Sequence, residues 1–302
     1  MCRIAGIISK TLPEHQLLEK INTMCAILAH GGPDDEGIYY AREDGIVFGN
    51  RRLSILDLGP NGHQPMAGVN NEVWISFNGE IYNYNELKEE LRQTGAAFKS
   101  TSDTEVLIQA YRKWGTDTFA KLRGMFAFAL HDTIKNKVYL VRDSSGIKPL
   151  YYTIKDDDLY FASEIKAISG SGLQTINDNN WPIRFLAFGH IPEPYTTLKN
   201  VYSLPKGNFL CWDNITRKHH LVNYSVPSQP GKQIADKKTA EQGIREIFDA
   251  AVKRQLIADA SIGVFLSGGI DSSLVTLCAD RHSTQQLKTV SIFFKERAYN
   301  ER

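Results

Sequence analysis

The feature that most constrains this chain is the cysteine at its second position, which an apolar run follows at once. Cys2 becomes the first residue when the initiator Met1 is removed, and a small side chain at that position permits the removal. An N-terminal cysteine carries its own base, because its free α-amine, with a pKa of about 8, can take the thiol proton directly or through a water. The run Ile4–Ile8 predicts a buried strand that holds this terminus in the fold. The sequence therefore allows a one-residue nucleophile; the alternative is an ordinary buried cysteine.

Size and charge exclude several classes of protein. The chain has 302 residues, of which 42% are hydrophobic, so it can bury a large core and is expected to hold more than one domain. Its 35 basic residues nearly balance 34 acidic ones, which argues against nucleic acid as the main partner. No apolar run approaches the ~18 residues of a membrane span, and the N-terminus lacks the plan of a signal peptide. We expect a soluble, cytoplasmic protein that does not bind membranes.

The four cysteines and eight histidines predict neither a disulfide frame nor a metal site. Cys25 falls on the apolar face of a helix predicted to start at Pro13, so core packing is its simplest role. His219 and His220 are the only adjacent histidines, and their polar surroundings indicate a solvated loop. The cysteines lie far apart and form no CxxC pair: Cys2, Cys25, Cys211 and Cys278.

A strand predicted over 73–77 runs straight into Asn78, Gly79 and Glu80. An Asn-Gly pair usually marks a hairpin turn. The same pair also places a side-chain amide beside an unhindered backbone N–H, and these are two donors for a developing oxyanion. Taken alone, the segment leaves both interpretations open.

Two further polar segments have simple structural interpretations. The spacing of Ser102 and Glu105 predicts a capping box at the start of a helix that ends at Gly115. Asp103 is then most simply a charge that favours the helix N-terminus. The segment Arg142–Tyr152 is polar, bears Gly and Pro, and joins two predicted strands, so it is most simply a surface loop.

The C-terminal part differs in composition. A stretch rich in Pro, Ser, Gln and Lys predicts a linker over 224–238, between domains at 1–223 and 239–302. A helix, a buried strand over 262–266, the loop Ser267–Ser273, another helix and a strand over 289–294 predict a βαβ unit with a parallel sheet. The loop offers N–H groups and hydroxyls to a phosphate at a helix N-terminus. It is neither a Walker A sequence nor GxGxxG.

Together these motifs resemble the glutamine-hydrolysing asparagine synthetases over essentially the whole chain. The loop at 267–273 resembles the pyrophosphate loop of their ATP-using synthetase domain. The resemblance implies an α+β protein: an N-terminal-nucleophile αββα sandwich, then the opening of a Rossmann-like α/β domain of the adenine nucleotide alpha hydrolase kind. The motifs that resemble a class II glutamine amidotransferase domain occur in the family's order: Met1–Gly6, Arg52–Asp57, Asn78–Asn83, Ser102–Glu105, Gly124–Ala129 and Arg142–Tyr152.

The resemblance assigns a role to each matching residue. Cys2 would attack the side-chain amide of glutamine, while Asn78 and the Gly79 N–H hold the oxyanion. Arg52 would bind the substrate α-carboxylate. Glu80 and Asp103 would bind its α-ammonium. ATP with Mg²⁺ would bind through these residues: Leu266, Ser267, Gly268, Gly269, Asp271, Ser272, Ser273 and Val290.

The implied reaction is glutamine-dependent asparagine synthesis, in which ammonia from glutamine displaces AMP from an adenylated aspartate. L-Glutamine, L-aspartate and ATP are then the small-molecule partners, and the sequence leaves open whether the chain forms a homodimer. A ligase for another carboxylate acceptor is an alternative. A silent partner-binding domain is disfavoured because all the site residues are present. Class II amidotransferases that act on sugar phosphates or phosphoribosyl pyrophosphate are disfavoured because their second domains lack the 267–272 loop.

Three features depart from the family pattern. Arg3 stands where glycine is frequent, so its side chain must point away from the thiol or to solvent. Gly31 follows His30 where arginine is more often found. The sequence ends at Arg302, whereas the family continues for a further domain-sized stretch. We therefore expect a truncated synthetase that hydrolyses glutamine slowly and makes no asparagine.

Overall fold

The computed structural model describes residues 2–225, 236–294 and 296. The chain divides into two compact units, 1–226 and 227–302, and each is described by itself. Most of the predicted linker falls on 226–235, which lie outside the described residues. On its N-terminal side, Tyr224 belongs to the first unit, because its hydroxyl donates to the carbonyl of Arg142 at 2.6 Å.

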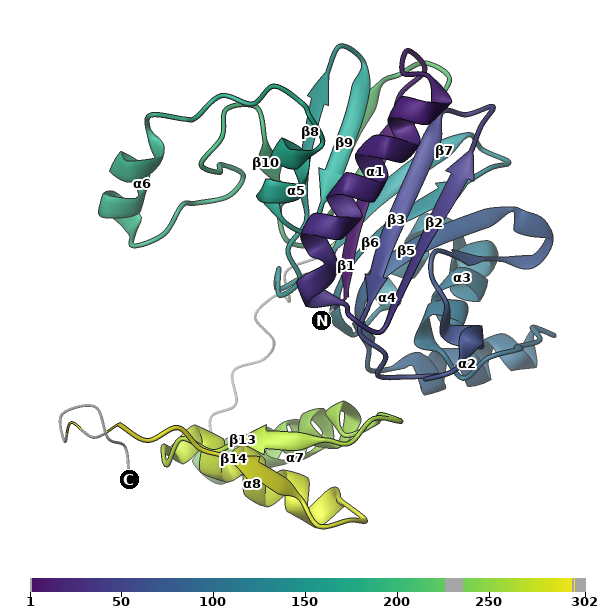
Figure 1. Cartoon of the computed structure of the whole chain (residues 1–302). Coiled ribbons are helices and arrows are strands. Elements are labelled where there is room, and N and C mark those ends of the chain that lie inside the picture. The colour runs from purple at the N-terminus through teal and green to yellow at the C-terminus, as the bar shows by residue number, and fades with distance from the viewer. Residues whose placement is uncertain (1, 226–235, 295, 297–302) are drawn as a thin grey trace. The chain divides into compact units, whose positions relative to one another are not determined.

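The first unit is a four-layer sandwich, with two six-stranded sheets between outer helices (Figure 1). The first sheet has the order β10-β8-β9-β1-β3-β2 and the second β12-β11-β7-β6-β5-β4. The strands of the first sheet are β1 Arg3–Ile8, β2 Asp35–Ala41, β3 Ile46–Arg52, β8 Tyr151–Lys155, β9 Asp158–Ala162 and β10 Tyr202–Ser203. Those of the second are β4 Met66–Ala67, β5 Val73–Ile81, β6 Gly124–Asp132, β7 Lys137–Arg142, β11 Asn208–Asp213 and β12 His219–Asn223.

Helices cover the outer face of each sheet, which confirms the predicted αββα architecture. The helix predicted from Pro13 is α1, Glu14–Leu28, and its buried face includes Cys25, as expected of a core cysteine. The other helices of this unit are α2 Tyr84–Gln93, α3 Asp103–Trp114, α4 Thr118–Lys121, α5 Ile165–Gly170 and α6 Trp181–Phe188. Single 3₁₀ turns lie at Ala29–Gly31, Pro60–Gly62, Val69–Asn71 and Gly115–Asp117.

Strand β1 is apolar on both faces because it lies inside the sandwich. Ile4 and Ile8 pack into the core between the two sheets, whereas Ala5 and Ile7 pack under α1. Both neighbours of β1 are antiparallel to it: β3 on one side and β9 on the other. Full burial of one such aliphatic side chain contributes about 1.5–3 kcal/mol, so the start of the chain is held firmly in the centre of its sheet.

Two local predictions in this unit are wrong. His219 and His220 lie in the edge strand β12, which pairs with β11, and not in a loop; their side chains are exposed, which explains the polar composition. The capping box is also incomplete. Ser102 accepts from the Thr104 N–H, but the Glu105 carboxylate accepts from the N–H groups at 99 and 100 instead of the cap residue.

The second unit has the predicted βαβ order, with parallel strands β13 and β14. The prediction that its first strand is buried is wrong, because Val264 packs on the helices while Phe265, on the other face, is 77% exposed. None of the helices in the described ranges is long and apolar enough to cross a membrane. The elements are α7 Lys237–Gln255, β13 Gly263–Phe265, α8 Ile270–His282 and β14 Lys288–Val290.

Candidate active site

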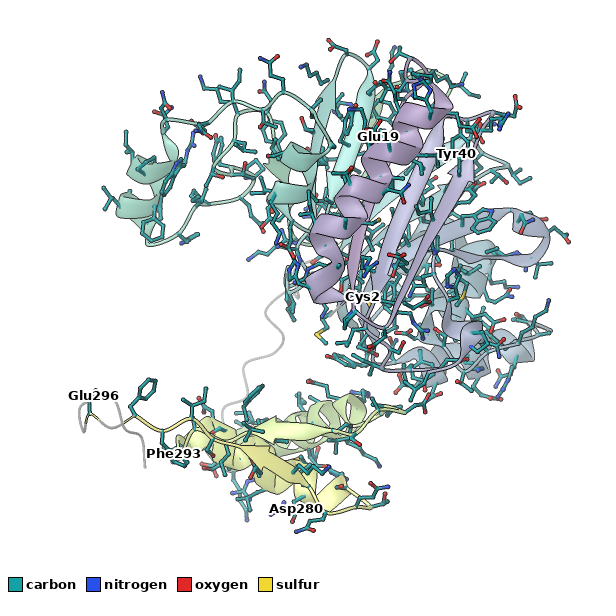
Figure 2. The ribbon with its side chains drawn as sticks, in the orientation of Figure 1. Cys2, Glu19, Tyr40, Asp280, Phe293 and Glu296 are labelled. Atoms are coloured by element: carbon teal, nitrogen blue, oxygen red, sulfur yellow. The ribbon has the colours of Figure 1, made fainter. Side chains whose placement is uncertain are left out.

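Cys2 lies at the start of β1, at one end of the first sheet (Figure 2). The register of β1 with β3 pairs Arg3 with Arg51, so Cys2 stands next to Arg52. The Cys2 thiol accepts from the Leu53 N–H at 3.3 Å and donates to the Leu53 carbonyl at 3.5 Å. Side chains alternate along a strand. Cys2 therefore points to the same side as Ile4, into the space between the two sheets.

Strand β5 of the second sheet faces the same space. The Ser76 hydroxyl donates to the carbonyl of Gly49 on β3 at 3.0 Å, so the even-numbered side chains of β5 point toward the first sheet. Asn78 and Glu80 are the next two even positions. The two sheets thus bring Cys2, the candidate nucleophile, to the same space as the Asn78 amide and the Glu80 carboxyl, although Cys2 is far from both in the sequence.

Asn78 has a buried amide without a protein partner. Its side chain is fully buried, and neither its nitrogen nor its oxygen has a hydrogen-bond partner among the described residues. An unpaired buried amide costs roughly 1–3 kcal/mol on the scale of protein mutations. An amide held in this way, on a strand whose ladder fixes its position, can stabilise a negative oxygen that arrives with a substrate.

The Asn-Gly pair is not a hairpin turn, because β5 continues through it to Ile81. Gly79 stands opposite Phe126 on β6, and a Cβ atom at Gly79 would lie 2.3 Å from the Met125 carbonyl oxygen and 2.7 Å from the Phe126 Cα. The two backbones approach too closely for any side chain, so glycine is required here for packing.

The direction of the Gly79 N–H follows from its partner strand. Phe126 uses both its N–H and its carbonyl with Asp143 on its far side. In an antiparallel pair the hydrogen-bonded and non-bonded positions alternate, so the Gly79 N–H points away from β6. Two residues further along β5, the Ile81 N–H points to this same side and donates to Asp103 at 2.9 Å.

Arg52 is held by backbone carbonyls at the end of β3. Its Nη2 donates to the carbonyls of Leu56 at 2.9 Å and Asp57 at 2.6 Å, and its Nη1 lies 3.5 Å from that of Gly59. These bonds fix a side chain that is only 5% exposed. The guanidinium is next to Cys2 in the register and has the geometry that binds a carboxylate through two oxygens.

The carboxyls of Asp103, which is buried, and Glu80, which is half-buried, act on each other. Burial, and after it the Asp103 carboxylate, raise the pKa of Glu80 to about 8, while Lys148 opposes the rise. Burial also raises the pKa of Asp103, against backbone hydrogen bonds from Ile81 and Thr104. Two carboxyls that repel each other in this way are stabilised by a cation placed between them, and the α-ammonium of an amino acid is such a cation.

Burial likewise raises the pKa of the Cys2 thiol, while the hydrogen bond to Leu53 and the Arg52 charge oppose the rise. The thiol is therefore mostly protonated at neutral pH and needs a base to react. A free α-amine on Cys2 would be that base.

The segment Arg142–Tyr152 is only in part the surface loop that its composition indicates: Ser144, Ser145 and Ile147 are exposed, whereas Asp143 and Lys148 are buried. Asp143 is fully buried and accepts from the N–H groups of Ser145, Ile147 and Lys148, while Lys148 is 2% exposed. Sequence reasoning assigned no role to Lys148, although it stands inside a motif of the resemblance. A lysine directly before Pro149, in a segment that also holds Gly146, was the available signal.

Arg3 and Gly31, the two departures from the family pattern near the N-terminus, are linked in the structure. As expected, Arg3 points away from the thiol: its Nε donates to Glu164 at 2.6 Å, and His30 contacts the same carboxylate. A Cβ atom at Gly31 would lie 2.6 Å from the Arg3 Cγ. Arg3 thus occupies the space beside residue 31, which explains why glycine stands at that position.

In the second unit, the loop predicted over 267–273 is shorter than expected: 267–269 join β13 to α8, and 270–273 form the first turn of that helix. The Ser267 and Ser272 hydroxyls lie 3.1 Å apart, and the Ser273 hydroxyl donates to the Gly269 carbonyl at 2.9 Å. The Leu266 N–H donates to the Val290 carbonyl at 2.9 Å. All the predicted nucleotide-binding residues thus lie at the carboxyl ends of two parallel strands, Gly268 and Asp271 included, the usual place for a ligand in such sheets.

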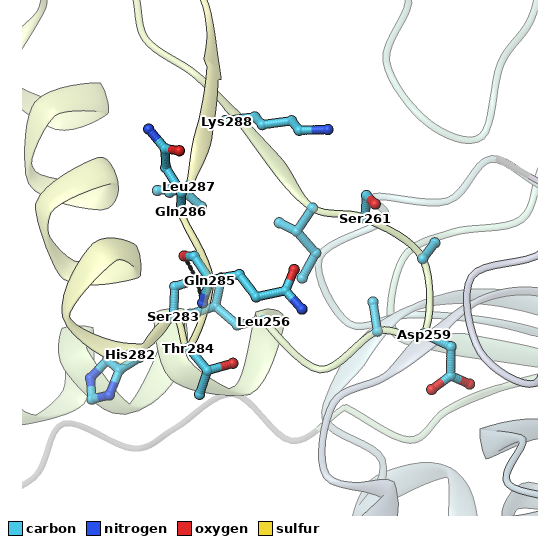
Figure 3. A pocket seen from close by; sticks show the side chains of 13 residues that line it. Leu256, Asp259, Ser261, His282, Ser283, Thr284, Gln285, Gln286, Leu287 and Lys288 are labelled. Carbon is cyan, nitrogen blue, oxygen red and sulfur yellow. Dashed lines mark hydrogen bonds between the residues drawn. The ribbon is translucent and has the colours of Figure 1, made fainter.

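A pocket of about 360 Å³ lies elsewhere in this unit (Figure 3). It is lined by Leu256, Asp259, His282 and Lys288, among others, and lies where the strands begin. This is the opposite end from the serine loop, so it does not enlarge that site. His282 and Cys278 both hydrogen-bond to Asp249, at 2.9 and 3.3 Å.

This contact forms a cluster that the sequence did not predict. The ligand atoms of Asp249, Cys278 and His282 lie within 4.8 Å of one another, which is compatible with a metal ion. The three groups also satisfy one another, since the carboxylate of α7 accepts from both residues of α8. The contacts are sufficient to join the two helices.

Comparison with known families agrees with this geometry. Residues 1–224 match the sequence model of the glutamine amidotransferase domain family. The chain belongs to this family. Residues 243–302 of this amidotransferase match the asparagine synthase family, so its second unit is the start of an asparagine synthase domain. The recognised resemblance is confirmed.

The amidotransferase is similar to several curated proteins along all or most of its length. It is 37% identical over 310 residues to asparagine synthetase [glutamine-hydrolyzing] 1 of Bacillus subtilis, covering 100% of this chain and 47% of the relative. It is 37% identical to putative asparagine synthetase [glutamine-hydrolyzing] 2 of Methanocaldococcus jannaschii, covering 61% of that protein. The amidase chry2 of Gibberella zeae is 32% identical, over 91% of this chain and 42% of the relative. The chain spans about half the length of these relatives.

A solved structure confirms the predicted fold. The glutamine phosphoribosylpyrophosphate amidotransferase of B. subtilis matches with a TM-score of 0.56 and 17% identity, over 98% of this chain and 67% of that chain. At this identity the likeness concerns the fold alone.

Proposed function

We propose that the first unit is a glutaminase that releases ammonia from the side-chain amide of L-glutamine. The observation that carries the proposal is the buried, unpartnered amide of Asn78, which faces the space that Cys2 and Arg52 also face. Glu80 and Asp103 place two carboxyls at the same end of the sheets, and a bound cation would favour their ionised forms. A site that binds and hydrolyses glutamine needs a cation for the α-carboxylate, anions for the α-ammonium and a nucleophile at the side-chain amide.

The proposed reaction follows from these positions. With Met1 removed, the α-amine of Cys2 takes the thiol proton, and the thiolate attacks the amide carbon. Asn78 and the Gly79 N–H donate to the oxyanion. The C–N bond breaks as the amine returns the proton to the leaving nitrogen, so ammonia and a γ-glutamyl thioester form. Water then attacks the thioester, which restores the Cys2 thiol and gives glutamate.

We further propose that the ammonia serves a glutamine-dependent asparagine synthase reaction, in which ATP, L-aspartate, L-glutamine and water give AMP, pyrophosphate, L-asparagine and L-glutamate. The serine loop at 267–273 would hold the pyrophosphate of ATP–Mg²⁺, and Leu266 and Val290 would lie by the nucleotide. The asparagine synthase match and the names of the two 37% identical relatives support this activity. A second candidate is transfer to a different carboxylate acceptor, which the likeness to an amidase favours.

Glutamate release from glutamine, measured on the purified chain, tests the glutaminase. We expect slow hydrolysis that Cys2→Ala abolishes and that Cys25→Ala, a change at another buried thiol, leaves nearly intact. Unchanged activity in Cys2→Ala would refute the proposal. Titration with ATP and Mg²⁺, with Ser272→Ala as the matched variant, tests the loop.

A further inference from the structure

The edge of β5 that faces away from β6 carries one of the proposed oxyanion donors. Strand β4 pairs with this edge over two residues, Met66 with Ile75 and Ala67 with Trp74. Pro65, directly before β4, has no N–H with which to continue the ladder. The ladder to β4 therefore ends at Ile75, and the backbone groups further along this edge of β5 need other partners.

Two side chains bond to this edge on either side of Gly79. Phe77, Gly79 and Ile81 direct their N–H groups to the same edge, because every second residue of a paired strand does so. The Phe77 N–H donates to the Oε1 of Gln64 at 2.7 Å, and the Ile81 N–H donates to Asp103 at 2.9 Å. The N–H proposed for the oxyanion thus lies between two N–H groups that side chains fix.

Gln64 shares the backbone of Phe77 with Asn50. The Asn50 Nδ2 donates to the Gln64 Oε1 and to the Phe77 carbonyl, each at 3.2 Å. Both backbone groups of Phe77 are therefore bonded to side chains, which do what a neighbouring strand does elsewhere in the sheet. Phe77 directly precedes Asn78, so these bonds fix the backbone that carries the proposed oxyanion donors.

The amide nitrogen of Gln64 links this edge to the start of α3. Its Nε2 donates to the Thr104 hydroxyl at 3.4 Å, and that hydroxyl donates to Asp103 at 3.5 Å. Gln64 is 5% exposed and Thr104 is 1% exposed, so both contacts are shielded from water. They are longer than the 2.7 Å bond to Phe77, and the main effect of Gln64 is therefore on β5.

We propose that Gln64 is a positioning residue of the oxyanion site: by bonding to the Phe77 N–H where β4 does not reach, it holds the Asn78 amide and the Gly79 N–H in place for the oxyanion. This inference rests on the proposed glutaminase function and deepens it. Oxyanion donors are effective when they are fixed before the reaction begins. Glycine has more backbone freedom than any other residue, so a strand that offers a glycine N–H needs support from its surroundings.

The test compares Gln64→Met, which keeps the length and loses the amide, with Gln64→Glu, which keeps an oxygen for the Phe77 N–H. Both kcat and KM for glutamine are measured, and kcat is referred to the folded fraction found by circular dichroism. We expect Gln64→Met to lower kcat by about 10–10²-fold, as a displacement of about 1 Å does, and to change KM by less than threefold. Gln64→Glu should recover most of kcat. An unchanged kcat in Gln64→Met, or an equal loss in both variants, would overturn the proposal.

Gln109→Met is the matched control, because Gln109 is also a buried glutamine. It is 8% exposed, and its Nε2 donates to the Ala97 carbonyl at 3.5 Å. Its replacement should change kcat by less than twofold even where it destabilises the protein. Equal losses of kcat at the two positions would make the effect a general one and overturn the role of Gln64. Where Gln64→Met does not fold, Gln64→Asn, whose amide is one methylene too short, is measured with the same expectations.

Hydrogen exchange of single amides, followed by NMR, needs no turnover. In Gln64→Met the Phe77 N–H loses its acceptor and should exchange at least tenfold faster relative to the amides of β6 than it does in the wild type. An inactive wild type together with this local change contradicts only the glutaminase. Unchanged relative exchange at Phe77 contradicts the role of Gln64, whether or not the chain hydrolyses glutamine.

Discussion

The unpartnered amide of Asn78 makes an unusual prediction: the change Asn78→Leu should stabilise the protein while it inactivates it. Leu has nearly the same shape as Asn and carries no polar atom to bury. Removing an unpaired buried amide should raise the free energy of unfolding by about 1–3 kcal/mol. At about 2–4 °C per kcal/mol for a domain of this size, the midpoint of thermal unfolding should rise by about 2–12 °C.

The same change should lower kcat for glutamine hydrolysis by about 10²–10³, which is the usual cost of losing one oxyanion donor. Asn50→Leu is the matched control. Asn50 is as buried as Asn78 and its Oδ1 also lacks a partner among the described residues, but its Nδ2 donates to Gln64, Ser76 and the Phe77 carbonyl at 3.1–3.2 Å. Its replacement should therefore destabilise the protein by about 1–3 kcal/mol.

The two measurements are differential scanning calorimetry of both variants and glutamate release under saturating glutamine. If Asn78→Leu lowers the unfolding midpoint as Asn50→Leu does, the amide is satisfied in the free protein and the reasoning is refuted. If hydrolysis stays within tenfold of the wild type, Asn78 does not hold the oxyanion.

Three other experiments test the remaining parts of the site. Mass spectrometry of the intact chain should show that Met1 is removed; a retained Met1 in an active enzyme would contradict the proposed base. Glu80→Gln should flatten the pH dependence of stability. The raised pKa of Glu80 lets the folded state keep a proton that the unfolded state releases, so wild-type stability should fall between the ordinary carboxyl pKa and about 8; equal slopes of midpoint against pH in both proteins would contradict this. Gly31→Arg alone should cost about 1–3 kcal/mol by crowding Arg3, and adding Arg3→Gly should recover most of it; an additive loss in denaturant unfolding would show that the two positions are not linked.

The sequence predicted the parts of this fold that depend on local periodicity. The apolar spacing from Leu17 to Leu28 gave α1, and the short β-rich runs after Gly124 gave β6 to β9. The resemblance supplied the layer order, which periodicity alone could not. Local composition failed where tertiary contacts decide the structure: the polar strand β12 is stabilised by pairing with β11, and Asp143 is buried inside a polar loop by accepting from the loop's own backbone N–H groups.

For the site, the residue types were predictable and their surroundings were not. Asn78 and Gly79 could be proposed as oxyanion donors from their chemistry, but an Asn-Gly pair also fits a turn, and only the ladder with β6 excludes the turn. The burial of Lys148 depends on a loop that passes between two sheets, and no short pattern encodes such a crossing. The Arg3–Gly31 contact joins residues that are adjacent only after α1 has returned along the sheet.

The position of β1 inside its sheet has a consequence for the removal of Met1 during synthesis of the chain. The strand is made first, but its second neighbour, β9, ends only at Ala162. At about 5–20 residues per second, a ribosome needs roughly 8–30 s to synthesise the intervening ~150 residues. During that interval β1 lacks its pairing with β9, so the N-terminus of the nascent chain stays accessible to the peptidase that would remove Met1. Maturation of the thiol can thus finish before the sandwich closes around it.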